Sequence, residues 1–280
     1  ALKYYIHSIR LFDKLIKENK SPIIYYYYGE LTNSIGIIYK KLENYNESIN
    51  YYKKYQDVSE YLGNKWGVGI AYNNIGIIYY RLKEYDKAIE QYEKGRKIFE
   101  DNGIYVFIPN ILLNLGNIYS DLKEFDKSLN YFNQAMDIYR KDGNIAGIIN
   151  IQTNIGDLYF EMKNYRKAKE CFENSLKLSQ KINNTDKEVY ISNYKGLHLV
   201  YEKLNNPKLS LKYYKLYSEM KDSLEMINKA EEIGMITENY KNEKRIEEQK
   251  RITEEQNRIE QENLNRRNNL QYMGILVVLL

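Results

Sequence analysis

Asparagine side chains recur at one register of this sequence and are its clearest candidates for binding chemistry. Asn74, Asn114 and Asn154 follow one another at intervals of 40 residues, each directly before an apolar residue and a glycine. A side-chain amide both donates and accepts hydrogen bonds, so a row of amides can hold an extended peptide backbone whatever its sequence. The same amides could instead bridge adjacent helices, and the sequence leaves both interpretations open.

Other reactive side chains are scarce. The histidines are His7 and His198 and the single cysteine is Cys171, so no His/Cys metal cluster can be assembled. The repeated glycines lie far apart within helical patterns, which is unlike a glycine-rich phosphate loop. The sequence predicts no catalytic residue, no cofactor and no metal, and it predicts that His198 and Cys171 are packed side chains.

Composition and charge limit the class of protein. Hydrophobic residues make up 43% of the chain, yet the mean hydropathy is −0.67, which favours thin layers of helices over a deep core. Residues 225–271 hold 9 Lys/Arg and 11 Asp/Glu, so the rest of the chain carries +6. Charges this evenly mixed are typical of a solvated surface, and no nucleic-acid partner is predicted.

The asparagine row belongs to a longer internal repeat. Gly36, Gly76, Gly116 and Gly156 stand 40 residues apart, and a fifth copy comes two residues late with His198 in the glycine position. A small residue and then an aromatic residue follow each glycine at fixed distances: Ser48, Ala88, Ser128 and Ala168, then Tyr52, Tyr92, Phe132 and Phe172.

The spacing within each copy predicts a pair of helices. Apolar residues recur every three or four positions, which indicates amphipathic helices over about 69–82 and 85–101 in the second copy. The short Lys83-Glu84 linker between them favours an antiparallel hairpin. Small residues at the Gly76 and Ala88 positions would let the two backbones approach, with aromatic rings filling the space around them.

The order Gly76, Tyr79, Ala88, Tyr92 and Gly95 resembles the tetratricopeptide repeat, and the resemblance covers about residues 1–223. It implies an all-α fold, a right-handed superhelical solenoid of antiparallel helix hairpins, followed here by a long charged helix. The predicted organisation is a truncated repeat over 1–24, five repeats over 25–223, the charged helix over 224–271 and an apolar end over 272–280.

The resemblance also places the first helix of each hairpin along a concave groove that binds a protein or peptide. The residues then expected to line the groove are Asn33, Asn73, Asn74, Ile77, Tyr80, Asn114, Asn117, Asn154, Asp157 and Phe160. Some members of the family clamp a carboxylate with lysines, but the corresponding positions here are Asn33, Asn73, Leu113 and Thr153. A carboxylate clamp of that kind is therefore rejected.

The charged helix is a candidate for self-association. Ile252 and Ile259 are seven residues apart, but the partner core positions are Glu, Gln and Asn, so one apolar residue per heptad predicts only a weak coiled coil. Pairs four residues apart support the helix itself: Glu247/Arg251, Glu254/Arg258 and Glu262/Arg266. A homodimer seam and a solvated single helix both stay open.

The apolar end suggests a membrane partner. Residues 272–280 are uncharged and largely apolar, and Arg266, Arg267 and Tyr272 resemble an interfacial border. We expect a transmembrane helix to begin at Tyr272, although nine residues are fewer than the ~20 that a span needs. The alternative is an apolar segment packed against the repeats.

This order of parts resembles the sensor half of bacterial tetratricopeptide signalling proteins, of the kind common in Bacteroidetes. The resemblance implies a single-pass membrane protein with extracytoplasmic repeats and a histidine kinase or helix-turn-helix output elsewhere. The predicted function is thus peptide or protein sensing in signal transduction. The alternative is a soluble scaffold or adaptor for complex assembly, or the sensing region of a helix-turn-helix regulator.

Overall fold

The computed structural model describes residues 2–18, 21–182 and 186–279, with side chains described except at 2, 3, 17 and 268–279. The described chain is helical and divides into two units, residues 1–217 and 218–280. The helices are α1 Leu2–Glu18, α2 Pro22–Lys41, α3 Tyr45–Tyr61, α4 Lys65–Arg81, α5 Tyr85–Asp101, α6 Ile108–Asp121, α7 Phe125–Lys141, α8 Ile145–Glu161, α9 Tyr165–Lys181, α10 Lys187–Lys203 and α11 Pro207–Leu279, with a short 3₁₀ turn η1 Tyr105–Phe107 before α6.

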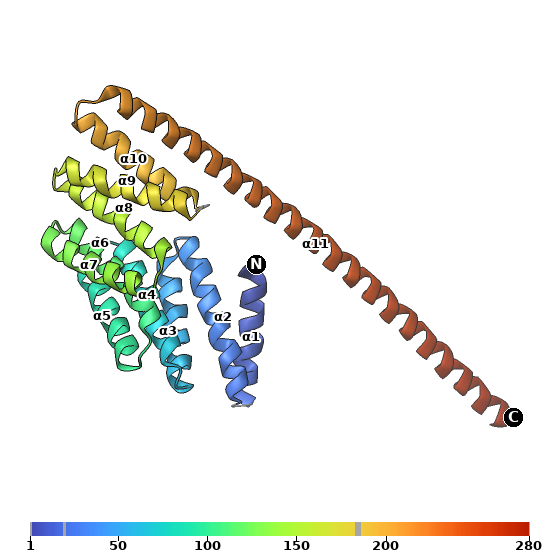
Figure 1. The fold of residues 1–280 in the computed structure, drawn as a ribbon. Helices are drawn as coiled ribbons and strands as arrows, with labels where there is room; N and C mark the ends of the chain where they lie inside the picture. Colours follow the sequence, from blue (N-terminus) through green and yellow to red (C-terminus); the bar gives the residue numbers. More distant parts are fainter. Residues whose placement is uncertain (1, 19–20, 183–185, 280) are drawn as a thin grey trace. The chain divides into compact units, whose positions relative to one another are not determined.

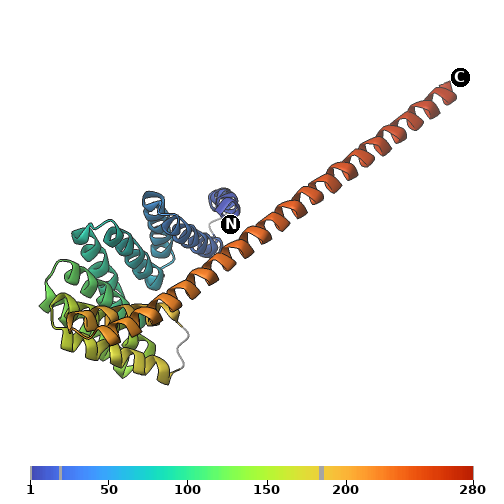
Figure 2. The same ribbon diagram turned by 90° about the horizontal axis from the view of Figure 1, so that it is seen from above.

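Unit 1 is an array of hairpins in which each helix packs against the next one in the chain. Figure 1 shows successive helices lying side by side, and seen from above the hairpins follow one another round an arc (Figure 2). The predicted all-α solenoid is confirmed. Helix α5 has the predicted bounds, whereas α4 begins at Lys65, four residues before the predicted start, because the Asn64 side chain caps it by accepting a hydrogen bond from the Gly67 amide at 3.1 Å.

Glycine lets the two helices of a hairpin touch. A Cβ on Gly116 would lie 2.5 Å from Cε1 of Phe132, and one on Gly76 would lie 2.7 Å from Cε1 of Tyr92. Since both aromatic rings are fully buried, the glycine is the reason that the ring fits between the helices. The repeat predicted this arrangement of small and large residues.

Alternate repeats share details that their neighbours lack. The odd repeats place a serine hydroxyl against the first helix of the hairpin, as in Ser48 Oγ to the Gly36 carbonyl (2.7 Å) and Ser128 Oγ to the Gly116 carbonyl (2.8 Å), where the even repeats have alanine. The odd repeats also stack two tyrosine rings at 5.4–5.6 Å: Tyr39 on Tyr51, Tyr119 on Tyr131 and Tyr201 on Tyr213. The array thus has a finer period of two repeats.

The turns inside the hairpins carry left-handed residues that are not glycine. Lys83, Lys123 and Lys163 have φ of 58°, 60° and 59°, while the turns that lead to the next hairpin place Gly63, Gly103 and Gly143 at φ of 66–67°. A side chain at positive φ costs of order 1 kcal/mol, which glycine avoids.

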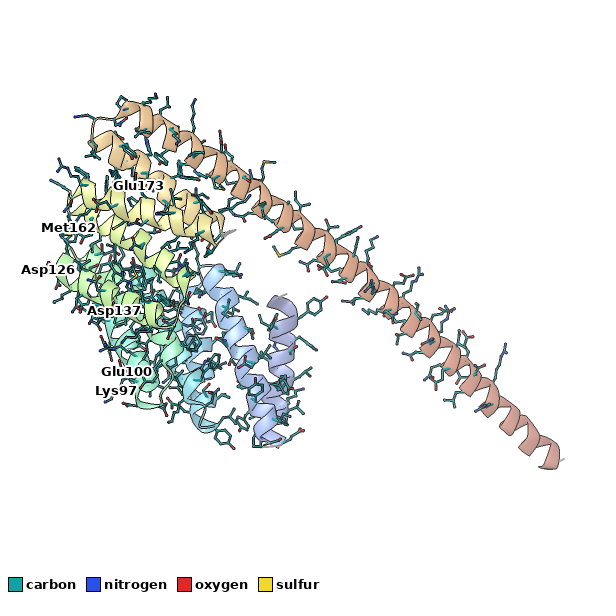
Figure 3. The ribbon with its side chains drawn as sticks, viewed as in Figure 1. Lys97, Glu100, Asp126, Asp137, Met162 and Glu173 are labelled. Atoms are coloured by element: carbon teal, nitrogen blue, oxygen red, sulfur yellow. The ribbon has the colours of Figure 1, made fainter. Side chains whose placement is uncertain are left out.

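Glycine at any of these three lysines is therefore expected to stabilise the protein by about 0.5–1 kcal/mol. The measurement is urea unfolding of the single variants followed by circular dichroism. The matched control is Lys97→Gly, within α5 and exposed (Figure 3), which should lose about 1 kcal/mol because it is an ordinary helical position. Loss of stability in all three turn variants would contradict the expectation.

Helix α11 continues through unit 2, where every described side chain from 225 to 267 is exposed. Its ion pairs differ from the expected ones: Lys250 pairs with Glu254 at 3.8 Å, and Arg258 pairs with Glu255 at 2.8 Å. The predicted homodimer seam stays a prediction.

The membrane prediction is wrong. No helix in the described residues is both long enough and apolar enough to cross a membrane, because strongly charged sequence directly precedes the short apolar run. The predicted start of a span over 272–280 falls on residues whose side chains, and at 280 also the backbone, lie outside the described ones. The single-pass location with extracytoplasmic repeats is corrected by this finding.

Candidate functional site

The first helices of the hairpins form one layer of the array. Helices α4 and α6, α6 and α8, and α8 and α10 are in contact, although each pair is separated in the chain by a second helix. The side chains on this layer therefore meet across hairpins, as a groove requires.

Two asparagine pairs link neighbouring helices of this layer. Asn74 Nδ2 donates to Asn33 Oδ1 at 3.4 Å, and Asn114 Nδ2 donates to Asn73 Oδ1 at the same distance. Bridging between helices, one of the two interpretations of the row, is thus observed at these positions. Each amide can form further hydrogen bonds, so bridging does not exhaust its capacity to bind a ligand.

Asn154 is different from the other two members of the row. Its amide donates to the Asn150 carbonyl within α8 at 3.0 Å. The reason is that Leu113 occupies the position that Asn33 and Asn73 hold in earlier repeats, so no amide stands opposite. Asn154 instead faces two cavities.

The first cavity lies between α4, α6 and α8 and has a volume of about 450 Å³. Four residues predicted from sequence line it together: Tyr80, Asn117, Asn154 and Asp157. The second cavity, of about 300 Å³, shares Asn154 and Asp157 with the first, so the two adjoin. Ile77 and Phe160, also predicted for the groove, are half-buried and pack against apolar neighbours of the core.

Sequence reasoning missed several residues that line the first cavity, namely Ser120, Asp121, Lys123, Phe132 and Glu161. Two of them could have been found from their position in the repeat. Asp121 and Glu161 stand 40 residues apart in the last turn of a first helix, where Lys41 and Arg81 stand in the earlier repeats. The charge at this position therefore changes from basic to acidic between the second and third repeats, and it is basic again at Lys203 in the fifth.

Asp157 is the most perturbed carboxyl in the groove. Burial among the groove walls raises its pKa to about 6, the nearby Lys195 opposes the shift, and Glu161 adds to it. Although neighbouring atoms surround its carboxyl group, Asp157 is still exposed to solvent, so the side chain can reach a ligand.

The described residues offer little for catalysis. They contain no group of three or more His, Cys, Asp or Glu that could hold a metal. His198 Nδ1 lies 2.9 Å from Ser210 Oγ, which holds the ring in the fifth hairpin. Burial raises the pKa of the Cys171 thiol to about 11, so the reactive thiolate is disfavoured.

Comparison with known proteins identifies the repeat. Family models described as tetratricopeptide repeats match residues 27–101, 109–142 and 147–223. The chain belongs to the tetratricopeptide repeat family. The tetratricopeptide fold is a binding architecture and not an enzymatic one, and it accounts for most of the chain. No curated protein matches the sequence.

Solved structures agree on the fold. BtubC from P. vanneervenii is 18% identical with a TM-score of 0.68, over 80% of this chain and 91% of that one. The apo form of RapI is 17% identical with a TM-score of 0.59, over 80% and 93%. A Rap conjugation gene regulator of plasmid pLS20, solved in complex with the Phr* peptide, is 17% identical with a TM-score of 0.59, over 73% and 55%. At such identities the likeness concerns the fold alone.

Proposed function

We propose that the tetratricopeptide array is a receptor for a short extended peptide, which lies across the first helices α2, α4, α6 and α8. The observation that carries the proposal is the cavity that Tyr80, Asn117, Asn154 and Asp157 line together, since four side chains on three hairpins converge there. Concave sites of a few hundred Å³ with a few converging polar groups are typical ligand sites.

The asparagine row supports a peptide over other ligands. Amides at a regular spacing can bond to successive backbone groups of an extended chain, each bond contributing about 0.5–1.5 kcal/mol. The pLS20 Rap regulator, which has a similar fold, was solved with a peptide bound, and this likeness favours the same class of ligand here.

A binding selection tests the proposal. A random octapeptide library is passed over the immobilised full chain, and the retained peptides are measured by mass spectrometry. The double variant Asn117→Leu/Asn154→Leu fills the cavity and should retain at least tenfold less than the wild type. The matched control is Asn133→Leu on α7, an exposed asparagine of a second helix, which should retain as much as the wild type. No retention by the wild type, or equal retention by the double variant, would refute the proposal.

A second candidate function is that of an assembly scaffold. It is favoured by the exposed Ile252 and Ile259 of α11, which are 44% and 48% accessible and seven residues apart. A partner helix or a second copy could cover them. The histidine kinase and helix-turn-helix outputs stay predictions from resemblance, and no finding tests them.

A further inference from the structure

One position of the repeat gives the first four hairpins a basic end and an acidic end. The last turn of the first helix carries Lys41 and Arg81 in the first two repeats, Asp121 and Glu161 in the next two, and Lys203 in the fifth. Since these residues share one register, they lie along the same line of the array. The sign changes between the second and third repeats.

At the basic end, no ion pair within the described residues neutralises the cations. Lys40 is half-buried, and burial lowers the pKa of its ammonium, with Arg81 and Lys41 adding to the effect by repulsion. None of the ion pairs in the described part of the chain involves these three cations. An anionic group placed here would relieve the repulsion between them.

The acidic end is the pair of adjoining cavities. Asp121, Asp157 and Glu161 line the first cavity and Lys123 is its one lining cation, while Asp186 and Glu188 add to the second. Asp121 Oδ2 accepts a hydrogen bond from the Tyr85 hydroxyl at 3.3 Å, and Lys195 lies near Asp157. The carboxylates still outnumber the cations, so the cavities suit a cationic group.

A buried hydroxyl lies in the second hairpin, near Tyr80 of the acidic cavity. Tyr92 is fully buried, and its hydroxyl has no hydrogen-bond partner within the described residues. Burial raises the pKa of this phenol, and the nearby Tyr80, which lines the acidic cavity, adds to the effect. Phe132, at the same position one repeat later, lines that cavity, so the position of Tyr92 is equivalent to one at the floor of the groove. The hydroxyl therefore keeps its capacity to donate and to accept a hydrogen bond.

We propose that the groove binds a peptide with opposite charges at its two ends, the cationic group among Asp121, Asp157 and Glu161 and the anionic group beside Lys40 and Arg81. Tyr92 then bonds to the segment between them once its hydroxyl is uncovered. This inference rests on the proposed function and specifies its ligand. The path from α4 to α8 crosses two steps between neighbouring first helices, at about 8–10 Å each. A peptide of about five or six extended residues spans that distance.

Five synthetic libraries of octapeptides test the charge requirement, each with four random uncharged residues in the centre and capped termini. Two libraries carry Lys-Lys at one end and Asp-Asp at the other, in either order, and three carry Lys-Lys, Asp-Asp or Gln-Gln at both ends. We expect the full chain to retain at least one of the two dipolar libraries at least tenfold better than any of the other three. Equal retention of the neutral or the all-lysine library would overturn the inference while leaving peptide binding intact. No retention of any library would refute peptide binding as well.

Variants then assign the two ends. Asp157→Lys/Glu161→Lys should abolish the preference for dipolar peptides and raise retention of the all-aspartate library at least tenfold. The matched control Asp126→Lys/Asp137→Lys changes two exposed aspartates of α7 (Figure 3) and should behave as the wild type. Tyr92→Phe, the residue type that later repeats use, should weaken retention at least threefold without loss of thermal stability. Unchanged retention by the lysine pair or by Tyr92→Phe would contradict the assigned contacts.

Discussion

Replacing Phe132 with alanine is expected to destabilise unit 1 by about 3–5 kcal/mol, the usual cost of removing a fully buried aromatic ring. The ring is 1% accessible and fills the space above Gly116, in the cluster of buried residues that joins α5, α6, α7 and α8. Its removal leaves a cavity between hairpins that pack only against their neighbours, so the loss cannot be shared across a larger core.

Urea unfolding measures the effect, and the chain provides its own control. Tyr214 holds the same position in the fifth repeat but is 48% accessible, because no following hairpin covers it in the described structure. Tyr214→Ala should therefore cost only about 1–1.5 kcal/mol, half of a full burial. Similar losses of unfolding free energy in the Phe132 and Tyr214 variants would show that these rings do not stabilise the protein through their burial between hairpins.

Replacing Asn193 with alanine is expected to cost about 2–4 kcal/mol, because it removes several hydrogen bonds from a buried polar network and leaves Thr153 and Ser175 with fewer partners. Asn193 Nδ2 lies 3.1 Å from Thr153 Oγ1, 2.9 Å from Ser175 Oγ and 2.8 Å from the Val189 carbonyl. Thr153, Ser175 and Asn193 are all buried, so they form a closed polar network between α8, α9 and α10.

The matched control for Asn193 is Asn150→Ala, an exposed asparagine on α8, which should change stability by less than about 0.5 kcal/mol. A double-mutant cycle of Asn193→Ala with Ser175→Ala should give a coupling energy above about 1 kcal/mol. Additive effects in that cycle would mean that the network is not energetically connected.

The parts of the fold that follow from the 40-residue spacing of the repeat could be predicted from the sequence. Gly116 and Phe132 could be paired from spacing alone, because a small residue facing a large one is required wherever two helices touch. The start of α4 was missed because Gly67 and Gly69 look unlike a helix, and only the tertiary structure shows that both are buried where it begins. Contacts between hairpins override the low helix propensity of glycine there.

The candidate site was predicted less completely than the fold. Asn154 and Asp157 could be named from the sequence, and both line the two cavities; their place in a peptide groove stays a prediction. The bonds from Asn74 to Asn33 and from Asn114 to Asn73 could not be predicted, because they depend on how two helices are placed. Asp121 and Glu161 could not be found from the residues that precede each glycine, because they stand in the last turn of the helix. Asn193 was not identified, because with the two-residue offset it is equivalent to Ile151, an apolar position of the core.

The alternation of serine with alanine, and of stacked with unstacked tyrosines, sets how the array can change length. Both features lie within one hairpin: Ser128 of α7 bonds to the Gly116 carbonyl of α6, and Tyr119 of α6 stacks on Tyr131 of α7. Loss or duplication of a single copy would keep these contacts but would place two like hairpins next to each other. A change by a pair of copies keeps the alternation, so the step that preserves it is 80 residues, twice the visible period.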